Sequence, residues 1–425
     1  MDDLGRKDTG KLMERTRVLM LLQNAPYPHD QRVRGEAKAL ISAGIQVTLI
    51  CPGIEGQPRY EIFEGVRILR FPRPSYASSF LGYLYEYGYS MLMIFVISLY
   101  VFVRHGFDVV HAHCPPDAFV FIAAFYKVLG KQFVYDHHDL SPELYYARFG
   151  GSGNRYVYRT LSSFEKLSCR IADHVIATNQ SYKIVEMQRG GVPEDRITIV
   201  RNGPESNNAS SMDVELALRH RGKIILCYVG VMGNQDGVDY LLRALNHLVY
   251  DMGRTDFFCY LVGRGEAMPR LISLVDQLSL SEYVLFTGWV DRMEVPSYIN
   301  PADICVAPEP SNPYNDRSTS IKVMEYMQYA KPIVAFDLPE HRFSAQGAAV
   351  YATPNDERDY AQKIAFLMDD PVERQRMGQV GRNRIEKELA WSYQKLHLLD
   401  VYRVLSGDLP RYQTQSETIE SGQNQ

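Results

Sequence analysis

Short apolar runs alternate along the chain with longer segments of helical pattern. Between the first two runs, Val33, Ala37 and Leu40 fall on one face of a helix expected from about Asp30 to Gly44. Runs this apolar, each followed by a helix, predict a parallel sheet covered on both faces. In the first half the expected strands are RVLMLL (17–22), QVTLIC (46–51), VRILRF (66–71), DVVHA (108–112), QFVYD (132–136), HVIAT (174–178) and ITIV (197–200).

The same rhythm restarts after a polar stretch at 202–211, which is typical of a linker. The fold class predicted is α/β, with two tandem Rossmann-like domains at 16–205 and 212–390. Ligands of such sheets bind beyond the carboxyl ends of the strands, so two facing domains would share one cleft. A helix at 391–407 is expected to pack back on the first domain, and tails at 1–15 and 412–425 are expected to be disordered. The second set of strands is KIILCYVGV (223–231), FFCYLVG (257–263), YVLFTG (283–288), DICVA (303–307) and PIVAF (332–336), followed by helices from Asp356 to about Leu405.

Composition agrees with two soluble domains in 425 residues, with 46% hydrophobic and 23% charged side chains. The net charge of −4 argues against a general nucleic-acid binder. Six cysteines occur singly and without a CxxC pair. They are typical of buried thiols in a reducing compartment, so a cytoplasmic location is expected.

One apolar stretch, SMLMIFVISLYVFV from Ser90 to Val103, carries no charge before Arg104. At about 14 residues it is shorter than the roughly 20 that a spanning helix needs. It predicts either a buried or partly buried helix, or a helix that dips into one leaflet with the preceding YLYEYGYS at interfacial depth. A full membrane span is the least favoured of these.

A single carboxylate, Glu325, lies in an otherwise apolar helical segment. Ser318, Thr319 and Ser320 are good N-cap residues, so a helix is expected to begin near Ser320 and to hold a diphosphate at its start. Glu325 would lie about 6–8 Å further along the axis, near the ribose of the same nucleotide. The alternative is a surface glutamate paired with Lys322.

Several motifs in register resemble the family 4 glycosyltransferases, and the resemblance runs from about Arg17 to Leu405. It implies the GT-B fold and retaining transfer of a hexosyl group from a nucleoside-diphosphate sugar to a hydroxyl acceptor. It also makes Glu325 the second glutamate of the family's E-x7-E motif, which binds the nucleotide ribose. The motifs are NGPE (202–205), YVGVMGNQDGVDYLLRAL (228–245), YLVGRGE (260–266), FTGWV (286–290) and MEYMQYAKPIVAFD (324–337).

The chain departs from the family at positions that normally touch the donor. The first glutamate of the motif falls on Arg317, so Asp316 beside it is expected to substitute as a catalytic contact to the sugar. The family's diphosphate-binding Arg and Lys are also missing, with Val231 and Gln235 near their places. The phosphate charge would then fall to Arg317 and to a helix start made of Lys322, Ser318, Thr319 and Ser320. The alternative is that Arg317 is only a surface charge.

Glycines mark the loops where the diphosphate would approach. Gly230 and Gly233 follow the first strand of the second domain, and Gly263 belongs to the VGRGE loop. Glycine permits a close approach of backbone to ligand. We expect all three in the donor site, although they could only form turns.

Two segments of the first domain, DVVHAHCPPD and VYDHHDLSPE, are rich in imidazole and carboxylate. They follow two strands, so their side chains would gather at one sheet edge. The resemblance implies that His138 and Asp139 face the reacting centre, with His138 touching the transferred sugar or the acceptor hydroxyl. His113 is expected behind them on the acceptor side.

The loop PYPHDQR stands where the family usually has paired glycines. Asp30 and Arg32 are therefore expected to shape an acceptor pocket, against the alternative that Asp30 only caps a helix.

Two other functions stay open. The histidines with Asp117, Asp136 and Asp139 could form a metal site for a hydrolase such as a deacetylase, although no i, i+4 ligand pair is present. A nucleotide-sugar 2-epimerase shares the same architecture. The apolar segment and the family motifs favour transfer, with UDP as the default nucleotide. The resulting prediction is an enzyme without metal or cofactor that extends a lipid-linked or cell-surface polysaccharide precursor at the inner face of the cytoplasmic membrane and binds no nucleic acid.

Overall fold

The computed structural model describes residues 16–73, 80–149, 151, 153–204 and 222–409. The expected tails and most of the expected linker lie outside this range. The chain divides into two compact units. The first contains the described residues up to Ser141, Leu161–Val200 and everything from Lys395, and the second contains Pro142–Thr160 and Arg201–Gln394.

The division lies close to the predicted domains, with two differences. Pro142–Thr160 groups with the second unit instead of the first, and the C-terminal helix begins in the second unit and ends in the first. Within the first unit that helix makes specific contacts: the Tyr402 hydroxyl lies 2.8 Å from His111 Nδ1, and Gln132 Nε2 donates to Leu405 O at 3.0 Å.

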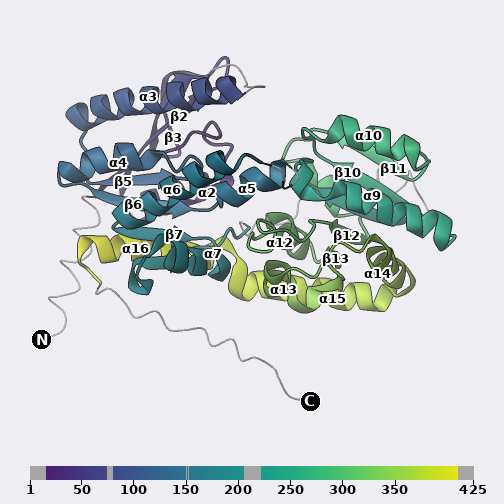
Figure 1. Cartoon of the computed structure of the whole chain (residues 1–425). Coiled ribbons are helices and arrows are strands. Elements are labelled where there is room, and N and C mark those ends of the chain that lie inside the picture. Colours follow the sequence, from purple (N-terminus) through teal and green to yellow (C-terminus); the bar gives the residue numbers. More distant parts are fainter. Residues whose placement is uncertain (1–15, 74–79, 150, 152, 205–221, 410–425) are drawn as a thin grey trace, which may run out of the picture. The chain divides into compact units, whose positions relative to one another are not determined.

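The first unit is built on an eight-stranded sheet in the order β3-β4-β2-β1-β5-β6-β7-β8 (Figure 1). All its pairs are parallel except β3 with β4. All seven expected strands are present. The unpredicted β3 is an edge strand joined to β4 by Glu64 and Gly65, which both have positive φ as tight hairpin turns require. The strands are β1 (Arg17–Leu21), β2 (Gln46–Gly53), β3 (Tyr60–Phe63), β4 (Val66–Pro72), β5 (Val109–His113), β6 (Gln132–His137), β7 (His174–Ala177) and β8 (Ile197–Ile199).

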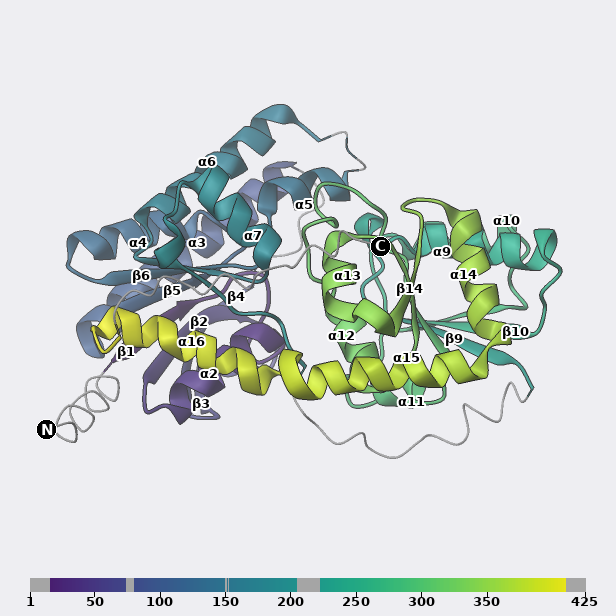
Figure 2. The ribbon, with the colours of Figure 1, turned by 90° about the horizontal axis from the view of Figure 1, so that it is seen from below.

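Helices cover both faces of this sheet, as the apolar strands predict. In Figure 2, α2 and α16 lie on one face and α3, α4 and α7 on the other. The helices of this part of the chain are α2 (Gln31–Ser42), α3 (Phe80–Arg104), α4 (Phe119–Val128), α5 (Ser141–Arg148), α6 (Arg155–Ile171), α7 (Gln180–Val185) and α16 (Trp391–Ser406), with a π turn at Glu186–Gly190 and a 3-10 turn at Glu194–Arg196.

Helix α3 is longer than predicted, because the tyrosine-rich residues before Ser90 belong to the same helix. By length and composition, its residues Tyr85–Arg104 form the one described helix that could cross a membrane, with mean hydropathy 1.6 and 22% of the stretch buried. The prediction from a 14-residue stretch was therefore wrong about length. The helix nevertheless joins β4 to β5 of one sheet, and Ser90, Ile94, Ser98 and Val101 form its buried face.

The second unit has a six-stranded parallel sheet in the order β11-β10-β9-β12-β13-β14. All five predicted strands are present. One core cluster packs the sheet against α9, α10 and α14, and the other packs it against α12 and its neighbours. The elements are β9 (Ile224–Val229), α9 (Val238–Asn246), β10 (Phe257–Val262), α10 (Met268–Gln277), β11 (Val284–Gly288), α11 (Val295–Ile299), β12 (Ile304–Ala307), α12 (Ile321–Gln328), β13 (Ile333–Phe336), α13 (Pro339–Ala345), β14 (Ala349–Ala352), α14 (Glu357–Asp369) and α15 (Pro371–Arg384), with shorter turns of helix at Asn234–Asp236, His247–Asp251, Gln346–Ala348 and Ile385–Leu389.

Candidate functional site

The strand order of the second unit reverses at β9. Strands β10 and β11 lie to one side of it, and β12, β13 and β14 to the other. Open parallel sheets bind ligands beyond the carboxyl ends of their strands at such a reversal. The chain leaves β9 through Gly230 and β12 through Pro308 and Glu309. These residues mark the candidate donor site.

The loops after β9 and β10 approach so closely that side chains are excluded. A Cβ on Gly263 would lie 2.0 Å from Gly230 O, and Gly263 has a φ of +127°. A Cβ on Gly230 would lie 3.0 Å from Lys322 Cε. Gly233 belongs to the turn after β9, where its N–H already donates to Asp236 Oδ2 at 3.0 Å. The geometry thus gives Gly230 and Gly263 a steric reason to be glycine at this edge.

Lys322, on the first turn of α12, lies among three oxygen atoms at this edge. Its Nζ is 2.8 Å from Glu309 Oε1, 3.5 Å from the Tyr228 hydroxyl and 3.6 Å from Asp236 Oδ1. Burial lowers the pKa of Lys322, but Glu309 and its other neighbours outweigh this and leave the pKa well above its usual value. Burial raises the pKa of Glu309, and Lys322 reverses the shift to about 2. The pair is therefore ionised at neutral pH.

The loop before α12 uses its polar groups within itself. Arg317 Nη1 donates to Pro313 O at 2.6 Å, and Ser318 Oγ donates to Tyr314 O at 2.9 Å. Asp316 Oδ2 accepts from Ser311 Oγ at 3.2 Å, and its buried Oδ1 has no hydrogen-bond partner among the described residues. Arg317 and Ser318 thus stabilise the loop here, and their expected contact with phosphate gains no support from this geometry.

Helix α12 begins where the sequence predicts, with Ser320 as its N-terminal flanking residue, but no described side chain caps it. Ser320 Oγ instead donates to Glu309 Oε1 at 2.7 Å, and Thr319 Oγ1 donates to Glu340 Oε2 at 3.4 Å. The first-turn N–H groups therefore keep an uncapped positive end. The anion-binding element would be the backbone of this helix start and Lys322, with the hydroxyls in a supporting role.

Glu325 lies one turn further along α12 and is half-buried. Burial raises the pKa of its carboxyl, against the opposing effect of Arg292 and Lys322. Among the described residues no hydrogen bond or ion pair involves this carboxylate, and the Lys322 ammonium contacts Glu309. The surface ion pair considered from the sequence does not form, and the carboxylate can accept bonds from a diol.

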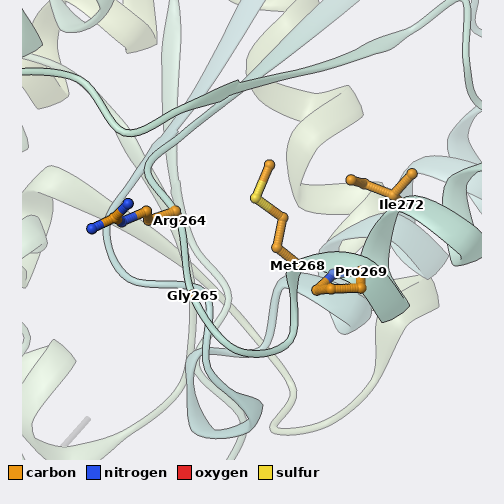
Figure 3. A pocket seen from close by; sticks show the side chains of 5 residues that line it. All are labelled: Arg264, Gly265, Met268, Pro269 and Ile272. Atoms are coloured by element: carbon orange, nitrogen blue, oxygen red, sulfur yellow. The ribbon is translucent and has the colours of Figure 1, made fainter. Parts of the chain in front are cut away.

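A hollow of about 520 Å³ adjoins the loop after β10 and is lined by Arg264, Gly265, Met268, Pro269 and Ile272 (Figure 3). Arg264 and Gly265 come from the loop, and the other three from the start of α10. The Arg264 guanidinium lies over the Trp289 ring, 5.3 Å from its centroid. Apolar side chains beside a stacked cation suit the flat face of an aromatic ring.

A second cluster lies in the first unit and is centred on Asp136. Its Oδ2 is 2.8 Å from His113 Nδ1 and 3.1 Å from His138 Nδ1, and Arg32 Nη2 donates to its Oδ1 at 2.7 Å. Burial lowers the pKa of His138, but Asp136 more than reverses this, so the net pKa is raised. Burial raises the pKa of Asp136, and Arg32 with His138 drives it well below its usual value.

The structure corrects the predicted acceptor residues. Asp30 accepts from Val33 N at 3.1 Å, so it caps α2 as the alternative proposed. Arg32 is enclosed, with a side chain only 4% exposed, and cannot line a pocket. His113 is also fully buried, whereas the His138 side chain is 10% exposed. Asp139 is half-buried, and its backbone N–H lies 3.4 Å from Cys114 Sγ.

The acidic and imidazole side chains of the hypothetical metal site are already engaged with other side chains in this cluster. Glu36, His111, His113 and Asp136 do offer atoms within 4.8 Å of one another. The Arg32 guanidinium, however, lies 3.1 Å from Glu36 Oε1 and 2.7 Å from Asp136 Oδ1, so a cation already pairs with both carboxyl groups. Asp117 lies elsewhere and accepts from the Tyr135 hydroxyl at 2.6 Å.

Sequence reasoning missed the residues that organise both clusters. Glu309 and Asp236 flank Lys322, and Asn315 ties the loop before α12 to the loop after β9, donating to Gln235 O at 2.9 Å. The sequence signal that could have identified Glu309 was an acidic residue just after a buried strand, in CVAPE. Asp136 carried a similar signal at the end of QFVYD, and it was considered only as a metal ligand.

Family comparisons agree with this arrangement. Residues 31–206 match the model described as Glycosyltransferase Family 4, and residues 223–370 match Glycosyl transferases group 1. A glycosyltransferase of Methanocaldococcus jannaschii is 25% identical over 71% of this chain and 74% of its own length.

Solved structures with the same fold cover nearly the whole chain. Sucrose-phosphate synthase from Thermosynechococcus elongatus has a TM-score of 0.76 at 17% identity, covering 93% of this chain and all of that one. Anabaena HepE, solved with UDP and glucose, has a TM-score of 0.70 at 14% identity, covering 91% and 99%. The two units are thus the α/β domains of a GT-B protein, and the family matches in both halves identify the chain as a family 4 glycosyltransferase.

Proposed function

We propose that this transferase takes a hexosyl group from a UDP-sugar bound at the carboxyl edge of the β9–β12 sheet. The observation that carries the proposal is the convergence of the Lys322 ammonium, the uncapped start of α12 and the unpaired Glu325 carboxylate at the strand reversal. The ammonium and the helix N–H groups would hold the diphosphate. Glu325 would accept from the ribose diol.

The hollow beside Arg264 would take the base, because it adjoins Gly263 and offers apolar side chains and a stacked Arg264–Trp289 pair. A neighbour with the same fold, HepE, was solved with UDP and glucose, which supports uridine as the base to test first. Lys322 and the helix start together can stabilise charge on the leaving diphosphate, so we propose transfer that needs no metal.

Nucleotide-induced thermal stabilisation tests this donor site. Wild type, Glu325→Gln and the control Glu282→Gln, an exposed glutamate of the same unit, would be melted with UDP, GDP, ADP and TDP, each with and without EDTA. We expect UDP to raise the Tm of wild type and control regardless of EDTA, and to have little effect on Glu325→Gln. Equal stabilisation of all three proteins would remove Glu325 from the site.

For the reaction we propose front-face displacement with retention, in which the leaving phosphate helps to deprotonate the acceptor hydroxyl. This rests on the family's chemistry and on a donor site that supplies positive charge to the leaving group. Proton NMR of the first-formed product decides it, since a retaining enzyme keeps the anomeric configuration of the donor. Inversion would overturn this step and leave the donor site intact.

The acceptor is proposed to be lipid-linked, because the first unit presents an apolar surface over α3 and α4. The two helices lie side by side, with Phe95 and Phe125 in edge-to-face contact at 5.3 Å. Val103 is 86% exposed and Val128 87%. The exposed apolar side chains of this surface are Tyr85, Leu92, Val96, Tyr100, Val103, Phe121, Phe125 and Val128.

Cations border this apolar surface. Arg104 follows Val103 directly and is exposed, whereas Lys127 and Lys131 are half-buried and pair with Asp173 at 2.7 Å and with Asp108 at 3.8 Å. On α6, which contacts α4 through Phe121 and Phe164 at 5.2 Å, Lys166 and Arg170 are exposed. Apolar side chains framed by cations match a leaflet with anionic headgroups, and would bring the enzyme to lipid-linked precursors at the inner face of the cytoplasmic membrane.

Vesicle flotation tests the surface. Wild type should float with phosphatidylcholine vesicles containing phosphatidylglycerol and less well with phosphatidylcholine alone. The triple variant Leu92→Ser, Val96→Ser, Val103→Ser should stay in solution, whereas the control Val372→Ser, an exposed valine of α15, should float as wild type does. Equal flotation of wild type and triple variant, or none by wild type, would overturn the proposed surface.

A further inference from the structure

The carboxylate of Asp136 is shared by two imidazoles and one guanidinium, and this fixes where their protons lie. Its Oδ2 faces His113 Nδ1 at 2.8 Å, His138 Nδ1 at 3.1 Å and Arg32 Nε at 2.9 Å. An ionised carboxylate only accepts hydrogen bonds. Each imidazole must therefore carry a proton on Nδ1, which leaves Nε2 as the nitrogen that can meet another molecule.

Of these side chains that of His138 is the most exposed. Its side chain is 10% exposed, whereas those of Asp136 and His113 are fully buried and that of Arg32 is 4% exposed. Asp136 lies near the end of β6 and His138 follows that strand directly, and the 3.1 Å contact between them shows that their side chains turn to the same side. The intervening His137 is directed the other way and contacts Glu186 at 3.1 Å.

Arg32 holds Asp136 in a single orientation. Its guanidinium donates to both carboxylate oxygens and, through Nη1, to Val200 O at 2.8 Å. Glu36 from α2 lies 3.1 Å from Arg32 Nε, and His111 from β5 lies 3.5 Å from Glu36. Other charges that act on the imidazoles are those of Asp30 and Asp139. These contacts hold the Asp136 carboxylate in the orientation that faces His138.

We propose that Asp136, anchored by Arg32, is a positioning residue that fixes the Nδ1–H form of His138 and so presents Nε2 to the sugar or acceptor hydroxyl. The contact of Nε2 with the sugar or acceptor rests on the proposed transfer reaction. The position of the proton on Nδ1 is independent of that reaction. In the neutral form of His138, Nε2 is a hydrogen-bond acceptor. After protonation the same nitrogen becomes a donor, and Asp136 stabilises that cation.

The first test uses the wild-type protein. Imidazole nitrogen NMR of histidine-labelled protein, with His138 assigned from the missing signal of His138→Gln, would be recorded above the pH at which His138 titrates. We expect the proton on Nδ1 and a bare Nε2. The opposite tautomer would overturn the proposal without any mutation of the cluster.

The second test removes the charge with Asp136→Asn and uses Asp117→Asn as the matched control, since Asp117 is also buried and hydrogen-bonded in this unit. In Asp136→Asn the pKa of His138 should fall by at least about one unit and UDP release from UDP-glucose should slow by roughly 10-fold, with UDP stabilisation retained. The control should leave the pKa of His138 unchanged.

These outcomes separate two failures. An unchanged pKa of His138 in folded Asp136→Asn would overturn the positioning role. Absence of UDP stabilisation in the wild type would overturn the proposed donor site and leave the proton placement standing. If Asp136→Asn does not fold, the wild-type spectrum still decides the matter.

Discussion

Each unit places one cation between two acidic side chains near the carboxyl edge of its sheet, but the two clusters differ in how fully their hydrogen bonds are used. Arg32 donates to both oxygens of Asp136 and to a backbone carbonyl, all at 2.7–3.1 Å. Lys322 has one close partner, Glu309 at 2.8 Å, and two distant ones at 3.5 and 3.6 Å. A saturated guanidinium fixes geometry, whereas an ammonium with loose contacts can rearrange toward a phosphate.

The same contrast appears in exposure. The side chain of Arg32 is 4% exposed and that of Lys322 is 11% exposed, next to a helix start that no described side chain caps. Charge pattern alone would assign both clusters the same role. Their difference agrees with our proposals that the first unit positions a reacting group and that the second unit binds the donor diphosphate.

The largest effect is expected from Lys322→Met. Removing one partner of a buried pair leaves Glu309 and Asp236 as uncompensated charges, which costs about 3–5 kcal/mol of unfolding free energy. UDP stabilisation should also vanish. Urea unfolding and thermal shift measure the two effects.

A double variant separates stability from binding at this cluster. Lys322→Met with Glu309→Gln removes both charges of the closest pair and should recover part of the lost stability, yet should still show no UDP effect. Persistent UDP stabilisation in the double variant would show that Lys322 is structural only.

Arg32→Met should destabilise by a similar amount, about 3–5 kcal/mol, because Asp136 would lose its buried counter-charge. The UDP affinity of the folded fraction should stay within about twofold of that of wild type, since Arg32 does not contact the nucleotide-sugar in our proposal. Titration calorimetry at a temperature where the variant is folded measures this. A large loss of UDP affinity would break the distinction between a positioning cluster and a binding cluster.

The sequence predicted the sheets, the start of α12 and the position of Glu325 along that helix, because these depend on local patterns of apolar spacing. It did not predict that Ser320 would bond Glu309 or that Arg317 would bond Pro313 O. Such choices depend on loop geometry, since a hydroxyl before a helix can cap it or turn to a neighbouring strand.

Partners distant in sequence account for the remaining errors. Arg32 was expected to shape an acceptor pocket, but it is buried, and pairing with Asp136, 104 residues away, makes its burial tolerable. Glu309 lies 13 residues before Lys322, beyond helical spacing, so no periodic pattern links them. For Arg32 the missing information was which strands are neighbours, and for Lys322 it was the path of the loop between β12 and α12.

A smaller effect is expected from Glu325→Gln when UDP is compared with 2′-deoxy-UDP. A carboxylate that accepts from the ribose diol should make wild type prefer UDP by about 10-fold, in line with a charge-assisted hydrogen bond of roughly 1.5 kcal/mol. The variant should bind UDP more weakly and lose most of this preference. Competition binding measures both ratios, and an unchanged preference would place the ribose elsewhere.

The pH dependence of stability also distinguishes the two units. Burial lowers the pKa of His137, but Glu165 and Glu186 reverse this and raise it to about 10. Stability from a raised pKa is fully present below the ordinary value of about 6.5 and is lost as pH rises through about 10. The first unit should therefore lose up to about 1.4 kcal/mol per pH unit between pH 7 and 9. Glu309, with a pKa of about 2, stays ionised across this window in the second unit.

The tryptophans make this difference measurable, because both of them, Trp289 and Trp391, belong to the second unit. Between pH 7 and 9 the urea midpoint by tryptophan fluorescence should hold steady, while a component of the circular dichroism transition moves to lower urea. In His137→Gln that component should start at lower urea and shift less with pH. A parallel shift of both signals would show that the two units unfold as one and would contradict a pH effect confined to the first unit.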